Sequence, residues 1–216
     1  MEAMVQGQVV KGRGLQYQIN LGDFMGFLEE FHKDESVVKH VNRTFIALVP
    51  KKANPVHLKD YRPISLVGAA YKFLAKVLAN RLKKVMDKII SPFQMAFVSG
   101  RQIVDSFVIT EEVIHSWKKS ESGGILLKLD FEKAYDSVCH DLLYKVLNSM
   151  GFGVMWIDWI KSCVSSPLLS VLINGSPSKE FSMDRGLRQG YPLSLFLFNL
   201  AVEVLSHLFE KVRLQG

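Results

Sequence analysis

The sequence predicts an α+β fold, with helices and short strands mixed in an irregular order. Long stretches repeat apolar residues at helical spacing, and short apolar runs stop at proline, glycine or Asn-Gly. Of the 216 residues, 48% are hydrophobic and 22% are charged, which is ordinary for a folded chain and argues against disorder. We find no internal repeat and no interdomain linker. A chain of this length can bury one sizeable core, or two small lobes that share one.

Regular elements are predicted from residue 24 onward, while residues 1–22 have no clear period and stay unassigned. Apolar positions 24, 27, 28 and 31 predict a helix over 24–31. Residues 44–50 (TFIALVP) predict a short strand stopped by proline, and a polar loop leads to a small strand at 64–67. A strong helix follows over 69–90, with the apolar stripe Leu74, Leu78, Leu82, Val85 and Ile89.

The centre of the chain predicts a helix, a strand and a second helix. The first helix covers 102–119, with Ile103, Phe107, Thr110, Ile114 and Trp117 in line. Residues 125–130 (ILLKLD) form a compact apolar run, which predicts a strand. Asp136 is the predicted N-cap of the second helix, whose left-handed stop is Gly151 and whose stripe is Val138, Leu142 and Val146.

The C-terminal part predicts two helices around a hairpin. Trp156, Trp159, Ile160 and Cys163 mark a short helix. Residues 168–183 predict a hairpin, because Asn174-Gly175 suits a type I′ turn. An almost wholly apolar helix is predicted over 193–212. Its most apolar part, 193–205, is interrupted by Asn199 and Glu203 and is too short to span a bilayer.

The sequence also argues against several classes of protein. Its two cysteines form no CxxC pattern, and the six histidines show no zinc spacing, so we expect a reduced intracellular compartment without structural zinc. No secretory leader is expected at the start. Cys139 and His140 lie about 100° apart on a helix, which excludes a nucleophile–base pair between them. Neither GxSxG nor GxGxxG occurs.

Positive charge is concentrated in residues 51–101. The net charge of the chain is +6, yet this segment holds eleven Lys or Arg against two Asp, a balance of +9, so the remaining residues sum to −3. Lys72, Lys76 and Lys83 share one face of the predicted helix, and Arg101 ends the segment. Such a segment suits a polyanion, because phosphate contacts release counterions. A solvated helix face explains it about equally well.

Asp130 is the sharpest candidate for chemistry. It ends the predicted strand 125–130, where a carboxylate on a rigid edge can present oxygen to Mg²⁺. Taken alone, an Asp at a strand end is more often a turn or cap residue. Tyr135 could lie against whatever Asp130 holds, or could be a core aromatic at the start of a helix. Asp136 is interpreted as a cap rather than as a second ligand.

Two further segments suit phosphate. Residues 185–192 (RGLRQGYP) lead from a strand into a helix, and Gly186 and Gly190 let the backbone come close to a ligand at the helix N-terminus. Many strand-to-helix turns carry two glycines, so this pattern is weak alone. Lys51, Lys52 and Arg62 flank an exposed loop, for which a phosphate clamp and a solvated loop are about equally plausible.

Eight blocks, taken in order, closely resemble plant LINE-type (non-long-terminal-repeat) retrotransposon reverse transcriptases. They are FIALVPKKANP, LKDYRPISL, YKFLAKVLANRL, QMAFVSGRQIVDS, LLKLDFEKAYDSV, GFGVMWIDWI, SVLINGSP and RGLRQGYPLS. The resemblance covers roughly residue 23 to the C-terminus. It implies a right-hand polymerase, with a basic fingers region at 23–120 and a partial palm at 121–216, and without a thumb.

The resemblance also implies roles for particular residues. Asp130 matches the first palm aspartate, a ligand of two Mg²⁺ ions. Lys51 and Arg62 match positions that contact the triphosphate of the incoming nucleotide. Tyr135 matches the aromatic residue that favours deoxynucleotides, and Gln189 and Gly190 match the loop beside the nascent base pair. The implied partners are an RNA template, a DNA primer and deoxynucleoside triphosphates, in the nucleus and away from membranes. The basic residues Lys72, Lys76, Lys83 and Arg101 are the expected nucleic-acid contacts.

This chain departs from the family pattern in several places. The later F/Y-A-D-D block, which supplies the second and third carboxylates, does not occur in it. Tyr191 stands where the family usually has Asp, Leu195 where it has Pro, and Cys139-His140 where it has an aromatic residue. We therefore expect this chain alone to be inactive, as a polymerase fragment, a non-catalytic nucleic-acid binder or the product of a degenerate copy.

Overall fold

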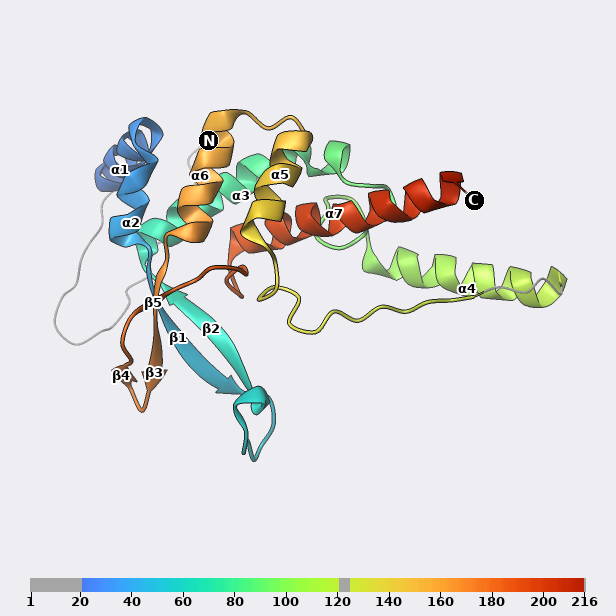
Figure 1. Cartoon of the computed structure of the whole chain (residues 1–216), viewed down its shortest axis with the longest axis horizontal. Coiled ribbons are helices and arrows are strands. Elements are labelled where there is room, and N and C mark those ends of the chain that lie inside the picture. The colour runs from blue at the N-terminus through green and yellow to red at the C-terminus, as the bar shows by residue number, and fades with distance from the viewer. Residues whose placement is uncertain (1–20, 121–124, 216) are drawn as a thin grey trace.

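The computed structural model describes residues 21–120 and 125–215, and it has the α+β fold that the sequence predicts. Figure 1 shows a body of helices, with a hairpin of two long strands projecting from one side. Helix α4 (Ile103–Ser120) extends away from the body at the opposite end. The unassigned segment 1–22 lies outside the described residues except for its last two, which begin helix α1 (Leu21–Lys33).

The core forms around helices α3 (Ala69–Ile89) and α7 (Pro192–Gln215), which pack along each other. The predicted stripe of α3 faces inward: Leu74, Leu78 and Leu82 are each 1% exposed. Burying a leucine contributes about 1.5–3 kcal/mol, so this stripe is a major source of stability. Helices α5 (His140–Ser149) and α6 (Val154–Ser165) pack together, and α5 also packs on α7.

The N-terminal helices join this body through aromatic contacts. The predicted helix over 24–31 is confirmed as α1, and Phe31 packs against Trp159 of α6 with ring centroids 5.4 Å apart. A short 3₁₀ turn, η1 (Glu35–Val37), is capped by Asp34, whose carboxylate accepts from the Ser36 amide. Helix α2 (Val38–Val41) then leads into the sheet.

A small mixed sheet has the strand order β2-β1-β3-β4, with β5 also paired to β3. Strands β1 (Arg43–Pro50) and β2 (Tyr61–Val67) form the projecting antiparallel hairpin, whose loop contains the 3₁₀ turn η2 (Leu58–Asp60). Strand β1 also pairs in parallel with β3 (Leu168–Ile173). This pairing joins the predicted fingers region and the predicted partial palm in one sheet.

The predicted Asn-Gly hairpin is confirmed. Asn174 and Gly175 have φ of 50° and 83°, and they connect β3 to β4 (Ser176–Pro177) with Ile173 opposite Ser176. Positive φ at both central residues is what a type I′ turn requires. Strand β5 (Phe181–Ser182) then pairs with the start of β3.

Helix α7 is longer than the apolar stretch that the sequence suggested. It has 24 residues, and by length and composition it could cross a membrane, so the argument from length was wrong. Two polar residues of α7 form hydrogen bonds with the segment that follows α3. Glu203, 2% exposed, accepts from the Ser91 amide, and Asn199 donates to the Ala96 carbonyl. Buried polar groups bonded in this way place the N-terminal half of α7 in the core.

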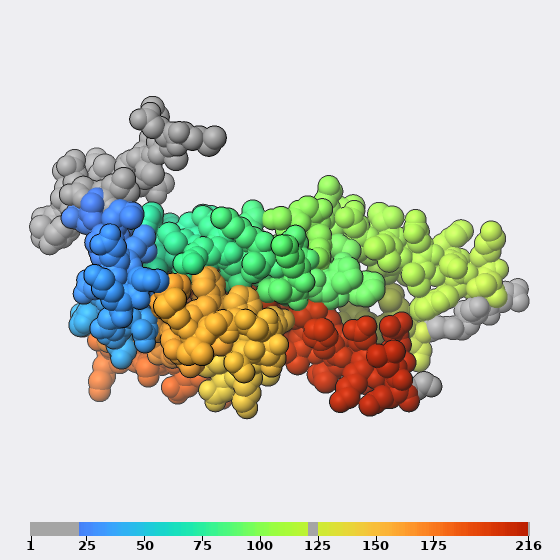
Figure 2. All heavy atoms as spheres, turned by 90° about the horizontal axis from the view of Figure 1, so that it is seen from above, coloured from blue at the N-terminus to red at the C-terminus, as the bar shows by residue number. Residues whose placement is uncertain are grey.

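Helix α4 confirms the predicted helix over 102–119, but its apolar stripe is only partly covered, with Thr110, Ile114 and Trp117 partly buried. None of its described residues is buried, and Ile103 and Phe107 are 66% and 67% exposed. Figure 2 shows α4 along one edge of the molecule and the C-terminal half of α7 along the other.

Candidate nucleotide and nucleic-acid site

Asp130 lies in an extended segment, not at the end of a strand. Residues 125–130 pair with no strand among the described residues, so the strand predicted there was wrong. A strand needs a neighbour for its backbone hydrogen bonds, and an apolar run alone does not supply one. The run is instead uncovered, with Ile125 93% and Leu127 70% exposed. The Asp130 side chain is exposed as well.

The segment after Asp130 folds into a turn rather than the first turn of a helix. The Lys133 carbonyl accepts from the amides of Asp136 and Ser137, and Lys133 has a positive φ of 51°. Helix α5 begins at His140, after Cys139, so Asp136 is not its N-cap and that prediction was wrong. Of the predicted stripe, Val138 and Val146 are buried, whereas Leu142 is 43% exposed.

Tyr135 belongs to this turn and is anchored on α7. Its ring stacks on Phe198, with centroids 4.7 Å apart and an interplanar angle of 25°. The side chain is partly buried, and this desolvation raises the pKa of the Tyr135 hydroxyl. The ring is therefore held in place within five residues of Asp130.

The loop 185–191 docks on the same turn. The Gly186 amide donates to the Val138 carbonyl, and the Leu187 amide donates to the Tyr135 carbonyl, both at 2.7 Å. His140 adds a bond of 2.8 Å between Nε2 and the Gly186 carbonyl. A Cβ on Gly186 would lie 2.8 Å from the Asp136 carbonyl oxygen. The absence of a side chain at Gly186 therefore lets the loop pack on the backbone of Asp136, and not on a ligand.

Gly190 differs from Gly186, although both have positive φ. It is exposed, and a Cβ there would meet no atom within 4 Å. The neighbouring Gln189 is partly exposed. The structure thus brings Tyr135 and the Gln189–Gly190 loop into one region, next to the segment that holds Asp130.

Arg188 is a buried residue of this loop that sequence reasoning missed. It is 7% exposed, and Nη1 donates to Asn42 Oδ1 at 2.6 Å and to Thr44 Oγ1 at 3.0 Å. Nη2 donates to the Cys163 carbonyl at 3.0 Å and to the Tyr71 hydroxyl. These contacts tie the loop to β1, α3 and α6, and no pattern along the chain signals them.

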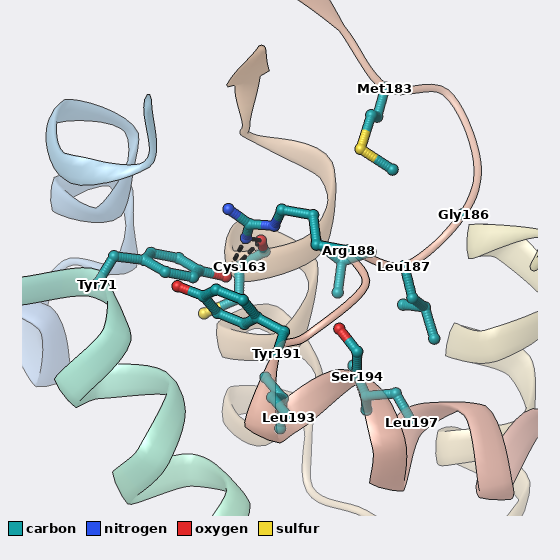
Figure 3. Close-up of a pocket in the computed structure, with 11 residues that line it drawn as sticks. Tyr71, Cys163, Met183, Gly186, Leu187, Arg188, Tyr191, Leu193, Ser194 and Leu197 are labelled. Carbon is teal, nitrogen blue, oxygen red and sulfur yellow. Dashed lines mark hydrogen bonds between the residues drawn. The ribbon is translucent and has the colours of Figure 1, made fainter. Parts of the chain in front are cut away.

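Two neighbouring aromatic rings, those of Tyr71 and Tyr191, lie against the Arg188 guanidinium, as Figure 3 shows. Its central carbon lies 4.4 Å from the Tyr71 ring centroid and 4.7 Å from that of Tyr191. Burial raises the pKa of both tyrosine hydroxyls, and it raises the pKa of the Cys163 thiol to about 12. These groups are therefore neutral at physiological pH, and the arginine is the charged member of the cluster.

The predicted phosphate ligands Lys51 and Arg62 lie on the β1–β2 hairpin, and both are exposed. Arg62 is opposite Val49 in the strand register, which places it diagonally across the hairpin from Lys51. Figure 1 shows the tip of this hairpin apart from the segment that joins α4 to α5. The structure does not bring these two cations together with Asp130.

Among the predicted nucleic-acid contacts, the three lysines and Arg101 differ. Lys72, Lys76 and Lys83 are exposed on α3. Arg101 instead donates to the carbonyl oxygens that follow the last turn of α3, at Ile90, Ser91 and Gln94. A cation suits this position, because carbonyls at a helix C-terminus carry partial negative charge. Arg101 thus has a structural role at the end of α3.

The described residues do not fit a two-metal centre. They contain no group of three His, Cys, Asp or Glu that could hold a metal ion. A single Mg²⁺ ion can bind through one or two protein carboxylates, with water and phosphate as its other ligands. A pair of Mg²⁺ ions needs more carboxylates than a single ion does. Asp130 is the carboxylate that the sequence predicts as one such ligand, and its side chain is exposed.

Residues 49–215 match the family described as reverse transcriptase (RNA-dependent DNA polymerase). This is more than half of the chain, so the chain belongs to the reverse transcriptase family. Enzymes of this family generally use divalent metal ions.

The relatives are proteins of mobile elements. The chain is 35% identical over 194 residues to the transposon TX1 uncharacterized 149 kDa protein of Xenopus laevis. The aligned residues make up 90% of this chain and 15% of that protein. It is 30% identical over 155 residues to the Retrovirus-related Pol polyprotein from type-2 retrotransposable element R2DM of Drosophila melanogaster, covering 72% and 14%. It is also 50% identical over 48 residues to the uncharacterized mitochondrial protein AtMg01250 of Arabidopsis thaliana, covering 22% and 39%.

These matches confirm the resemblance to LINE-type reverse transcriptases at the level of the domain. The chain spans about a seventh of the length of the Xenopus and Drosophila proteins.

Proposed function

We propose that this chain is the fingers and part of the palm of the RNA-directed DNA polymerase of a LINE-type retrotransposon. One observation carries the proposal. The loop in RGLRQGYPLS is hydrogen-bonded onto the turn in LLKLDFEKAYDSV, within a chain whose residues 49–215 match the reverse transcriptase family. Two blocks about fifty residues apart thereby form one region beside Asp130. The short but close match to the Arabidopsis protein supports a plant element.

The proposed substrates are deoxynucleoside triphosphates. Lys51 and Arg62 are exposed neighbours on the β1–β2 hairpin, and cations in that arrangement suit a triphosphate. Tyr135 and the Gln189–Gly190 loop would lie beside the sugar and the nascent base pair. The exposed Gly190 leaves room for a close approach of the nucleic acid.

The proposed macromolecular partners are an RNA template and a DNA primer, with the nucleus as the place of action. Exposed Lys72, Lys76 and Lys83 give α3 a basic face that can follow a phosphate backbone. Arg101 contributes positive charge nearby, although its guanidinium also holds the end of α3.

We further propose that the chain alone does not polymerise. Asp130 would hold Mg²⁺, which supplies charge neutralisation at phosphate when bound, but one carboxylate neither neutralises nor fixes two ions. No F/Y-A-D-D string occurs in the 216 residues. The single carboxylate therefore also favours a second candidate function, a non-catalytic nucleic-acid binder.

The binding of RNA tests the nucleic-acid part of the proposal. The affinity for a single-stranded RNA should fall as the salt concentration rises. In the triple variant Lys72→Gln, Lys76→Gln, Lys83→Gln this dependence should be shallower, with the slope of log K against log salt less negative by about 2. The matched control Lys145→Gln, an exposed lysine of α5, should leave the slope near its original value. An unchanged slope in the triple variant would exclude α3 as the nucleic-acid surface.

A further inference from the structure

The loop of the β1–β2 hairpin contains an almost buried carboxylate. The side chain of Asp60 is 9% exposed, although its neighbours from residue 56 to residue 59 are all exposed. A carboxylate is seldom sequestered at the tip of a projecting hairpin unless donors surround it.

Three donors surround this carboxylate. The amides of Val56 and His57 each donate to Oδ2 at 2.9 Å, and the Lys52 ammonium lies 3.0 Å from Oδ1. The backbone bonds from His57 and Val56, and then the bond from Lys52, hold the pKa of Asp60 below its usual value. The carboxylate is thus charged at neutral pH, and it draws the loop together from both ends.

The same residue also closes the base of the loop through its backbone. The Lys51 amide donates to the Asp60 carbonyl at 2.8 Å, and the Asp60 amide donates to the His57 carbonyl at 2.9 Å. The Lys51 ammonium donates to the Lys59 carbonyl at 2.9 Å. A carbonyl does not neutralise this ammonium, so Lys51 keeps its full charge in a defined place, whereas the charge of Lys52 is paired with Asp60.

We propose that Asp60 is a positioning residue for triphosphate binding, which orders the hairpin loop so that Lys51 and Arg62 meet phosphate together. Lys52 is then the partner of Asp60 and not a phosphate ligand. This inference rests on the proposed function of Lys51 and Arg62. An ordered loop saves the entropy of fixing two long cationic side chains when the nucleotide binds.

The sign of one substitution separates positioning from simple electrostatics. Removing an anion near a triphosphate should tighten binding if only net charge matters. If Asp60 orders the loop, Asp60→Ala should instead weaken binding of a fluorescent deoxynucleoside triphosphate with Mg²⁺ about tenfold. Asp87→Ala is the matched control, since it removes the charge of an exposed aspartate of the same basic segment and leaves the loop intact.

A second variant covers the case in which Asp60→Ala unfolds the chain. The side-chain carbonyl oxygen introduced by Asp60→Asn can still accept the two amides but cannot form the ion pair. The affinity of this variant should therefore fall below that of Asp87→Ala, by less than the tenfold loss expected for Asp60→Ala. Each variant is compared at the same temperature, with its fold checked by circular dichroism.

The outcomes distinguish positioning by Asp60 from the proposed binding of triphosphate by Lys51 and Arg62. If Lys51→Gln and Arg62→Gln weaken binding while Asp60→Ala and Asp60→Asn bind as tightly as Asp87→Ala, positioning by Asp60 is excluded and the phosphate site stands. If the unchanged chain binds no triphosphate, the phosphate site fails and the role of Asp60 fails with it.

Discussion

Arg188 is buried among neutral groups rather than beside a carboxylate. Amide, hydroxyl and carbonyl oxygens accept its hydrogen bonds, and the rings of Tyr71 and Tyr191 lie side by side against the guanidinium. A buried charge is tolerated when its donors are satisfied in this way. Tyr191, where the family usually has Asp, thus meets the guanidinium with a ring instead of a charge.

The two tyrosines beside Arg188 should respond differently to removal of the hydroxyl. Tyr71→Phe removes a donor to the Cys163 carbonyl and an acceptor for Arg188, so it should lower the free energy of unfolding by about 1–3 kcal/mol. Tyr191→Phe should be neutral or stabilising, because the buried Tyr191 hydroxyl has no hydrogen-bond partner within the described part of the chain. Urea denaturation measures both, and equal losses would contradict this assignment.

The two glycines of the same loop form a second matched pair. Gly186→Ala should be the more destabilising, because its Cβ would lie 2.8 Å from the Asp136 carbonyl oxygen and its φ is +90°. Gly190→Ala has the same kind of backbone strain, φ +83°, but open space around the Cβ. We expect about 1–2 kcal/mol for Gly190→Ala from the left-handed backbone and a larger loss for Gly186→Ala. Thermal unfolding of both variants measures these losses of stability. A smaller loss for Gly186→Ala than for Gly190→Ala would contradict the expectation.

For a single residue, the sequence predicts the chemistry of the side chain better than it predicts the partners of that side chain. Asp130 and Tyr135 were singled out from local features; the structure leaves Asp130 exposed and stacks Tyr135 on Phe198. Arg188 and Asp60 were not, because their roles depend on contacts that the local pattern does not signal. The Arg188 guanidinium meets Asn42 and Thr44, which are 146 and 144 residues away in the chain.

The β1–β2 hairpin should lose stability in acid through Asp60. Its folded pKa lies below the ordinary value of about 3.9, so its contribution is fully present above that pH and is lost as the pH falls through the folded pKa. The free energy of unfolding, measured from pH 5 to pH 2.5, should fall less steeply in Asp60→Asn than in the unchanged chain. Parallel curves for the two proteins would show that Asp60 adds no pH-dependent stability.

Elements with their own periodicity or turn chemistry were predictable, and those that need a distant partner were not. The stripe of α3 and the Asn174-Gly175 hairpin are local features, and both were confirmed. Residues 125–130 have the composition of a strand, yet no described strand pairs with them. Asp136 has the chemistry of a cap, but the turn closed by Lys133 delays the helix to His140.

Within residues 21–120 and 125–215, exposed apolar side chains gather on three segments. These are α4, residues 125–131 and the C-terminal end of α7, where Phe107, Ile125 and Val212 are 67%, 93% and 68% exposed. Uncovered apolar surface of this kind promotes association or aggregation.

Substitutions on α4 test this consequence. Phe107→Glu should reduce binding of the dye ANS and reduce aggregation at a given concentration, because it places a charge on the apolar face. Ser116→Glu adds the same charge at an exposed polar position of α4 and should change neither. Equal effects of the two substitutions would point to net charge rather than to the apolar face.

Primer extension tests the central proposal most directly, namely that these 216 residues bind primer–template but by themselves offer too few carboxylates to hold two Mg²⁺ ions. The purified chain is incubated with an RNA template, an annealed DNA primer, deoxynucleoside triphosphates and Mg²⁺, beside the Asp130→Asn variant. We predict no extension by either protein, under conditions in which the primer–template is bound. Extension by the unchanged chain that Asp130→Asn abolishes would contradict the account.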